Sequence, residues 1–431
     1  MYNIIIFLYL VGVALLSLFN EKVRKMWRGE RHAIRDIREK IDPDARYIWV
    51  HAASLGEFEQ GRPIIERIRE EMREDANSQK NIKILLTFFS PSGYEVRKNY
   101  EGADIITYLP LDTPRNARRF LRAIRPVCAI FVKYEFWYNY MHILKHRGVP
   151  VYSVSSIFRP EQVFFKWYGH FYRDVLRCIT HFFVQNEASK TLLRDKMGLT
   201  NVTVTGDTRF DRVLQIARQA KDLPLVEQFA NGRKTFIAGS SWQPDEDIFI
   251  PYFSNHPDWQ LIIAPHVIGE DHLTQIEQLL EKNGRKAVRY SRLKADGMQQ
   301  AGDGKGLAGD GYMNSPSALI IDCFGLLSSI YRYADVTYVG GGFGVGIHNL
   351  LEAAVWQKPV IFGPNNARFQ EAQDLKACHG GHEITDAATF SSIMDRFLAD
   401  NVYLQTCSAA AGDYVKSKSG ATDIIMQNIT Y

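Results

Sequence analysis

Glu57 is a glutamate at a position where an α/β enzyme could use one. It lies in the stretch Ile48 to Glu59 (IWVHAASLGEFE), in which an apolar run is followed by a turn and a helix. A carboxylate just beyond the carboxyl end of a buried strand can act as a general base. Ser54 and Glu57 also have the spacing of a capping box, in which Glu57 would only cap the helix. The spacing does not choose between these two roles.

A second glutamate, Glu135, follows the apolar run Val127 to Val132 in the segment KYEFWYN. It would stand at the carboxyl end of that strand, with the rings of Phe136 and Trp137 packed beneath it. The alternative is a buried carboxylate that pairs with a neighbouring base such as Lys133. Both interpretations stay open at this point.

A glycine-rich segment, Val339 to Ala354 (VGGGFGVGIHNLLEAA), predicts an apolar strand, a turn and a helix that begins at about His348. Backbone N–H groups of such a turn, together with the helix dipole, can hold a phosphate. Glu352 could then accept from a ribose hydroxyl or a base edge. In the alternative, the glycines only make a tight connection. The absence of GxxxxGK[ST], and of GxGxxG in the first βαβ unit, disfavours a P-loop NTPase or an NAD enzyme.

These segments belong to a chain that alternates short apolar runs with amphipathic stretches, the pattern of parallel α/β layers. Residues 213–232 contain a helix pattern, a proline and a turn, and they separate two series of strands. We therefore predict two facing α/β domains with the ligand in the cleft beyond the strand ends. Arg292 to Pro316, rich in Gly and Asp, is predicted to be a surface loop. The predicted strands are Tyr47 to Ala52, Ile82 to Phe88, Val127 to Val132, Val149 to Val154, His181 to Val184, Val202 to Thr205, Thr235 to Ala238, Leu261 to Ala264, Ala318 to Ile321, Val336 to Val339 and Pro359 to Phe362.

The N-terminal segment differs from the rest of the chain. Ile4 to Phe19 is an uncharged apolar run, marginally long enough to span a bilayer. Eight Lys and Arg residues follow within positions 22–40, so the positive-inside rule places the remaining chain in the cytoplasm. We predict an uncleaved membrane anchor at 1–21 and a basic juxtamembrane segment at 22–44 that meets anionic lipids. The alternative is a buried or interfacial helix.

Composition sets the remaining limits. The chain has 431 residues with a formal net charge of +4, too mild to indicate a nucleic-acid partner. Its five cysteines form no CxxC pair, which argues against a disulfide framework or a zinc site. We expect no metal site.

Taken together, the motifs resemble those of a known family. They are HAASLGE, EFWYN, QNE (Gln185 to Glu187), VTGDTRFD (Val204 to Asp211), APH (Ala264 to His266) and GGGFGVGIHNLLEAAVWQKPVIFGP (Gly340 to Pro364). In order and spacing they are similar, over nearly the whole chain, to the 3-deoxy-D-manno-octulosonic acid (Kdo) transferases of Gram-negative bacteria. The resemblance implies an α/β GT-B glycosyltransferase fold of two Rossmann-like domains. It also implies an inverting transfer of Kdo from the co-substrate CMP-Kdo to a lipid A precursor, at the cytoplasmic face of the inner membrane, without a metal or other cofactor.

The resemblance also assigns roles to single residues. It makes Glu57 the general base, placed by Ser54 and Gly56, and puts Glu135 in the same acceptor-side pocket. Residues 45–212 would form the acceptor-binding domain, 213–232 a linker, and 233–431 the CMP-Kdo-binding domain, with the last helix able to return to the first domain. The donor-side positions are Arg209, His266, Gly341, Gly342, Gly346, His348, Asn349 and Glu352.

The chain departs from the family at two motifs. It has VKYEFWYN where many members have METELWPN, so Lys133 and Tyr138 are its own residues at that wall. It also lacks the Arg of the PRH motif, where it has Pro265 and His266.

Two rival functions remain. One is another GT-B enzyme that uses a UDP-sugar, as glycosyltransferase or 2-epimerase. The other is a membrane-anchored nucleotide-binding protein without catalysis.

Overall fold

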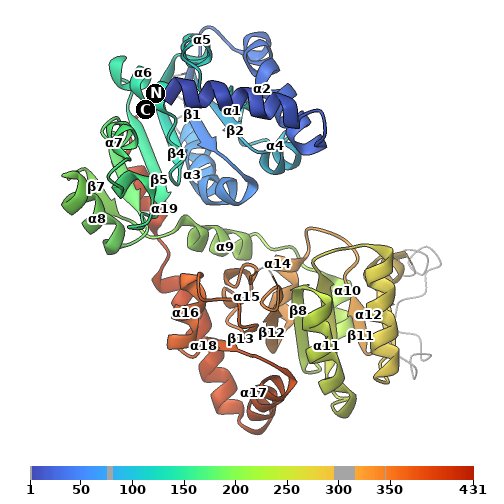
Figure 1. Cartoon of the computed structure of the whole chain (residues 1–431). Helices are drawn as coiled ribbons and strands as arrows, with labels where there is room; N and C mark the ends of the chain where they lie inside the picture. Colours follow the sequence, from blue (N-terminus) through green and yellow to red (C-terminus); the bar gives the residue numbers. More distant parts are fainter. Residues whose placement is uncertain (1, 75–80, 296–315, 345) are drawn as a thin grey trace. The chain divides into compact units, whose positions relative to one another are not determined.

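The computed structural model of the chain describes residues 2–74, 81–295, 316–344 and 346–431 (Figure 1). The chain divides into two compact units. Unit 1 contains Met1–Arg212 and Lys418–Tyr431, and unit 2 contains Val213–Ser417. The chain therefore passes from one unit to the other twice.

Unit 1 is built on a parallel sheet that has seven strands in the described residues, in the order β3-β2-β1-β4-β5-β6-β7. The strand order reverses beside β1, so the topological switch point lies between β1 and β4. Ligands of open α/β sheets bind beyond the carboxyl ends of the strands at such a point. The strands are β1 (Arg46–Ala52), β2 (Ile82–Phe88), β3 (Ile105–Tyr108), β4 (Pro126–Val132), β5 (Val151–Ser156), β6 (His181–Val184) and β7 (Val202–Val204).

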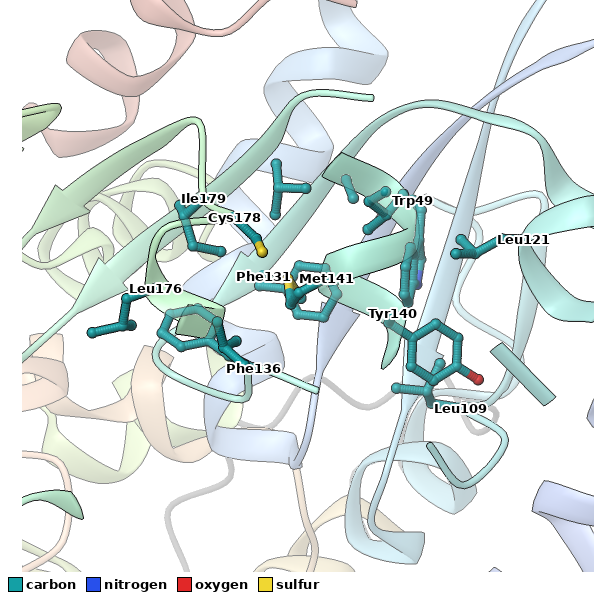
Figure 2. Close-up of a cluster of buried hydrophobic side chains, with 14 of the residues drawn as sticks. Trp49, Leu109, Leu121, Phe131, Phe136, Tyr140, Met141, Leu176, Cys178 and Ile179 are labelled. Carbon is teal, nitrogen blue, oxygen red and sulfur yellow. The ribbon is translucent and has the colours of Figure 1, made fainter. Parts of the chain in front are cut away.

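Apolar side chains on both faces explain why this sheet is buried. Along β1, Tyr47 and Trp49 belong to the core on one face, whereas Ile48 and Val50 belong to the core on the other, as the two-residue period of a strand requires. Figure 2 shows the first of these cores, in which Trp49 packs among rings and aliphatic side chains. Helices supply the covering surfaces because parallel strands need crossover connections.

The crossover helices of unit 1 begin at recognisable caps. The Thr113 side chain accepts from the Asn116 N–H, and the Asn186 side chain from the Ser189 N–H. The helices are α3 (Leu55–Glu74), α4 (Pro91–Arg97), α5 (Pro114–Ile124), α6 (Tyr138–His146), η1 (Val163–Phe165), α7 (His170–Leu176), α8 (Glu187–Met197), α9 (Thr208–Arg218), which runs on into unit 2, and α19 (Ala421–Asn428).

Two further helices, α1 (Tyr2–Leu16) and α2 (Glu21–Lys40), precede the sheet and lie against unit 1 (Figure 1). The apolar run predicted from sequence is thus helical. The Tyr2 hydroxyl donates to Asp112 (2.8 Å), and the Asn139 amide donates to the Asn3 side chain (2.9 Å). In the part of the chain that the structure describes, no helix is both long and apolar enough to cross a membrane.

Unit 2 repeats the architecture. Its parallel sheet has seven strands in the described ranges, in the order β10-β11-β9-β8-β12-β13-β14, and its switch point lies between β8 and β12. The strands are β8 (Thr235–Ser241), β9 (Gln260–Pro265), β10 (Ala287–Arg289), β11 (Ala318–Ile320), β12 (Val336–Val339), β13 (Val360–Phe362) and β14 (Gly381–Glu383). The helices are α10 (Pro224–Ala230), α11 (Gln243–Tyr252), η2 (Phe253–Asn255), α12 (Glu270–Lys282), α14 (Leu327–Ile330), η3 (Tyr331–Tyr333), α15 (Leu351–Ala354), α16 (Gln370–Ala377), α17 (Ala387–Ala399) and α18 (Asn401–Ser417).

The predicted α/β class with two parallel sheets is confirmed. Three short strands, β3, β10 and β14, were not predicted. Most of the predicted loop Arg292 to Pro316 lies outside the described residues.

Candidate active site

The switch point of unit 1 brings the two predicted glutamates to one edge of the sheet. Strands β1 and β4 are parallel neighbours, with His51 paired to Phe131 just before both strands end. Glu57 follows β1 in the first turn of α3, and Glu135 lies in the turn between β4 and α6. Both side chains are half-buried.

Glu57 is held by the backbone at its own turn. Its Oε2 accepts from the Ala53 N–H (2.6 Å), and its N–H donates to Ser54 Oγ at the long distance of 3.5 Å. The capping arrangement therefore exists, shifted by one residue. Burial raises the pKa of Glu57, while the Ala53 N–H and the nearby Lys133 charge lower it. A cap and a reactive carboxylate are thus compatible in this residue.

The two carboxylates influence each other. Burial and the Glu57 charge raise the pKa of Glu135 to about 7, and Lys133 lowers it. Like charges in one desolvated site do not ionise independently. Glu135 therefore holds its proton to higher pH than an ordinary glutamate, which suits acid–base chemistry.

Arg209, assigned to the donor side from sequence, lies in α9 within unit 1. Its Nε donates to Asp207 Oδ2 (2.7 Å), and Asp207 is buried and also accepts from the Gln60 amide (3.0 Å). This fixes the direction of the guanidinium. The other donor-side residues belong to unit 2.

The glycine-rich segment of unit 2 is a loop whose helix starts later than predicted. Helix α15 begins at Leu351, not at His348, and has four residues. The His348 N–H donates to the Gly340 carbonyl (3.1 Å), and the Asn349 side chain accepts from the Leu351 N–H (3.2 Å), which defines the true start. The predicted helix start at His348 is therefore wrong. A helix of one turn also has only a small dipole.

Close backbone contacts explain the glycines of this loop. Gly341 has a φ of 91°, and a Cβ there would lie 2.5 Å from the Gly346 carbonyl oxygen. A Cβ on Gly342 would lie 2.5 Å from Gly363 Cα. The N–H groups of Gly341 and Gly346 donate within the protein, to Asp245 and to the Gly341 carbonyl. These contacts agree with the alternative interpretation, in which the glycines make a tight connection between strand and helix.

His266 and His348, predicted separately, come together in a ring stack. Their centroids are 4.3 Å apart, and His266 also stacks on Trp242 at 4.8 Å. The Trp242 indole N–H donates to His348 Nε2 (3.2 Å), so His348 carries its proton on Nδ1. Burial and then His266 lower the pKa of His348 to about 4, and burial lowers that of His266. Both rings are therefore neutral at pH 7 and supply no cation.

Sequence reasoning missed Trp242 and Asp245, which lie at the switch point of unit 2. Asp245 is buried and accepts from the N–H groups of Trp242 (2.9 Å) and Gly341 (3.0 Å) and from the Tyr338 hydroxyl (2.7 Å). The signal was present in the sequence, because Pro244 and Asp245 directly after a strand are typical of a helix start. The pocket at this edge has a volume of about 150 Å³ and is lined by Trp242, Pro244, Asp245, Gly341, Phe343 and Gly344.

Asn349 and Glu352 are joined by a side-chain hydrogen bond. The Asn349 amide donates to Glu352 Oε1 (3.0 Å). The pair presents an amide and a carboxylate together, a combination that can bind hydroxyl groups of a sugar.

Comparisons with known proteins agree with this architecture. A solved UDP-GlcNAc 2-epimerase from Neisseria meningitidis, bound to UDP-GlcNAc, has a TM-score of 0.60 at 13% identity. It covers 88% of this chain and 98% of its own. This likeness concerns the fold alone, and it defines a GT-B-like protein with two Rossmann-like sheets.

Sequence comparison identifies the family. Residues 26–212 match the family model described as 3-deoxy-D-manno-octulosonic-acid transferase (kdotransferase). A 3-deoxy-D-manno-octulosonic acid transferase of Bordetella pertussis is 26% identical, over 88% of this chain and 86% of that protein. Over most of its length the chain is therefore similar to the Kdo transferases, which are glycosyltransferases of lipopolysaccharide biosynthesis. The resemblance and enzyme class predicted from the motifs are confirmed.

A further relative is longer than this chain. A bifunctional glycosyltransferase/methyltransferase of Fusobacterium nucleatum is 27% identical over 74% of this chain. The match spans 47% of that protein, about half of its length.

Proposed function

We propose that the chain transfers Kdo from CMP-Kdo to a lipid A precursor, with Glu57 as the general base. The observation that carries the proposal is the pair of carboxylates, Glu57 and Glu135, at the switch point of unit 1. The name of the relative in Bordetella pertussis, 3-deoxy-D-manno-octulosonic acid transferase, supports Kdo as the transferred group.

The transfer step requires an ionised Glu57. The acceptor hydroxyl gives its proton to a Glu57 carboxylate oxygen while the hydroxyl oxygen forms a bond to the anomeric carbon of Kdo. The bond between that carbon and the phosphate oxygen of CMP breaks, and CMP leaves with the bonding electron pair. Attack opposite the leaving group inverts the configuration. Glu135, with a pKa of about 7, would be the protonated partner beside a charged Glu57.

We propose that the donor binds to unit 2. The pocket beside Trp242 and Gly341 is at the switch point of that unit, where nucleotide ligands of such sheets bind. Gly342 and Gly346 belong to the same loop as the lining residue Gly341, and His266 stacks on the lining residue Trp242 and on His348. The Asn349–Glu352 pair would bind sugar hydroxyls. Arg209, oriented by Asp207, remains our candidate cation for the phosphate or the carboxylate of the donor.

We further propose that the enzyme works at the cytoplasmic face of a bacterial inner membrane, where its lipid acceptor resides, with α1 as the anchor. Apolar side chains of α1 such as Phe7, Leu8 and Leu15 are 59–64% exposed. The following helix exposes cations, including Lys22, Arg28 and Arg31. Apolar groups beside basic ones are what an anionic lipid surface binds.

The test of the base is Glu57→Gln, which keeps size and polarity but cannot accept the proton. Purified protein, CMP-Kdo and a tetra-acylated lipid A precursor are incubated, and mass spectrometry follows the added sugar. We expect the rate to fall by about 10²- to 10⁴-fold with unchanged thermal unfolding. The matched control is Glu70→Gln, an exposed carboxylate later on the same helix, which should transfer at the normal rate.

Two results would contradict the proposal. Near-normal transfer by Glu57→Gln would show that Glu57 is not the general base. No adduct with the unsubstituted enzyme, together with thermal stabilisation by UDP and not by CMP, would favour the UDP-sugar alternative.

A further inference from the structure

Lys133 occupies an unusual backbone position at the end of β4. Its φ is 61°, in the left-handed region that lysine rarely adopts. The Lys133 N–H donates to the Val154 carbonyl (2.8 Å), and the Lys133 carbonyl accepts from the hydroxyls of Ser153 (3.0 Å) and Ser156. Both serines are fully buried. Strand β5 therefore fixes this turn from both sides of the residue.

Strain of this kind persists only where the surroundings enforce it, and it is concentrated at functional sites. A glycine or asparagine would adopt the same backbone at lower cost. The chain instead places a cationic side chain at the switch point between β1 and β4. The position and the charge, not the turn alone, therefore need an explanation.

The groups around Lys133 are mainly acidic. Glu57 approaches from α3 and Glu135 from the turn that Lys133 itself begins, and the lysine charge acts on both. Tyr9 of α1 interacts with Glu135 and with Glu30 of α2. Ser153 and Ser156 of β5 are uncharged, and the positive charge of Lys133 acts on both half-buried carboxylates.

We infer that Lys133 is a positioning residue of the transfer step: its backbone is fixed at the edge of β1 and β4, and its positive charge there lets Glu57 stay ionised beside Glu135. The inference rests on the proposed role of Glu57. Without the lysine, the pair would hold its protons to higher pH, and the base would be neutral in a larger fraction of molecules. The lysine itself neither takes nor gives the transferred proton.

The experiment measures kcat/KM for Kdo transfer against pH in the full chain. Lys133→Asn removes the charge and suits the left-handed backbone, whereas Lys133→Arg keeps the charge. We expect the acid-side midpoint of the profile to move up by about one pH unit in Lys133→Asn and to stay in place in Lys133→Arg. At a pH well above the midpoint, Lys133→Asn should regain most of its activity.

The outcomes separate this inference from the proposed function. Absence of transfer by the unsubstituted enzyme refutes the function itself. If that enzyme is active but Lys133→Asn has the same midpoint, only the inference is refuted. A raised acceptor KM without a shifted midpoint also refutes it, because the lysine would then contact substrate. Should Lys133→Asn fail to fold, Lys133→Gly removes the charge and the strain together, and its midpoint decides in the same way.

Discussion

Asp245 accepts three hydrogen bonds in the interior of unit 2, from the Trp242 and Gly341 N–H groups and the Tyr338 hydroxyl. Glu57 in unit 1 also accepts from a backbone N–H, that of Ala53. The first carboxylate joins the ends of β8 and β12, whereas the second stands at an edge that we assign to the acceptor. Both carboxylates accept hydrogen bonds from backbone N–H groups, so these contacts do not distinguish a structural carboxylate from a reactive one. Substitution of each residue makes the distinction.

Asp245→Ala should destabilise the protein by about 3 kcal/mol, because it leaves buried donors without an acceptor. Asp245→Asn keeps one acceptor oxygen and should cost less. Urea unfolding at pH 7 measures both, with the exposed Asp247→Ala on the same helix as a control that changes stability by no more than about 0.5 kcal/mol. An Asp245→Ala protein as stable as the control would show that these three hydrogen bonds are dispensable.

The sequence predicted the part of the candidate site that follows long apolar strands. The apolar runs of β1 and β4 identified the edge at which Glu57 and Glu135 meet. The start of α15 was predicted too early, because LLEAA looks helical while the Asn349 side chain, which accepts from the Leu351 N–H, was overlooked. Strands β10 (AVR) and β14 (GHE) contain charged or polar residues, so they lack the apolar run that identified the equally short β7, β11 and β13.

At the scale of elements, the glycine-rich loop is packed backbone to backbone against the turn after β13. The Asn365 N–H donates to the Gly342 carbonyl (2.9 Å), and the Asn365 amide donates to the Gly344 carbonyl (2.7 Å). Gly342 lies against Gly363, whereas a Cβ on Gly344 would meet its nearest neighbour at 3.8 Å. Two glycines of one loop thus tolerate a side chain very differently.

Gly342→Ala should force the loop away from β13, lower the midpoint of thermal unfolding and abolish stabilisation by CMP. Gly344→Ala should keep the midpoint of thermal unfolding of the unsubstituted protein, since 3.8 Å is an ordinary contact. Thermal unfolding with and without CMP measures the difference, because a ligand that binds only the folded state raises the midpoint. Equal behaviour of the two variants would argue against donor binding at this loop.

At the scale of the whole molecule, charge and apolar surface are unevenly distributed. Much of the exposed large apolar surface of the described residues comes from the first nineteen positions, including Phe7, Leu8, Leu15 and Phe19. The hydrogen bonds of Tyr2 and Asn3 attach this helix to unit 1. An apolar helix attached in this way can present one surface to lipid while it stays part of the enzyme.

We expect the protein to co-sediment with vesicles that contain anionic lipid, and less so as salt is raised, because the exposed cations of α2 are screened. Replacement of Leu8 and Leu15 by Gln should weaken binding at least about tenfold, since each buries apolar area in the bilayer. The control is Val402→Gln, an apolar side chain of unit 2 that is 77% exposed. Equal loss of binding in the control would show that α1 has no special part in membrane attachment.

Because the chain crosses between the units twice, the last part of unit 1 is synthesised after unit 2. Asp211 accepts from the N–H groups of Gly420 (2.6 Å) and Thr422 (2.7 Å), and Ile425 and Ile429 belong to a core of unit 1. These residues leave the ribosome only after all of unit 2. Unit 1 must therefore wait, with part of its apolar core uncovered, while some two hundred intervening residues, Val213–Ser417, are translated. We expect the uncovered apolar surface of unit 1 to favour aggregation during that interval, and chaperones to reduce it.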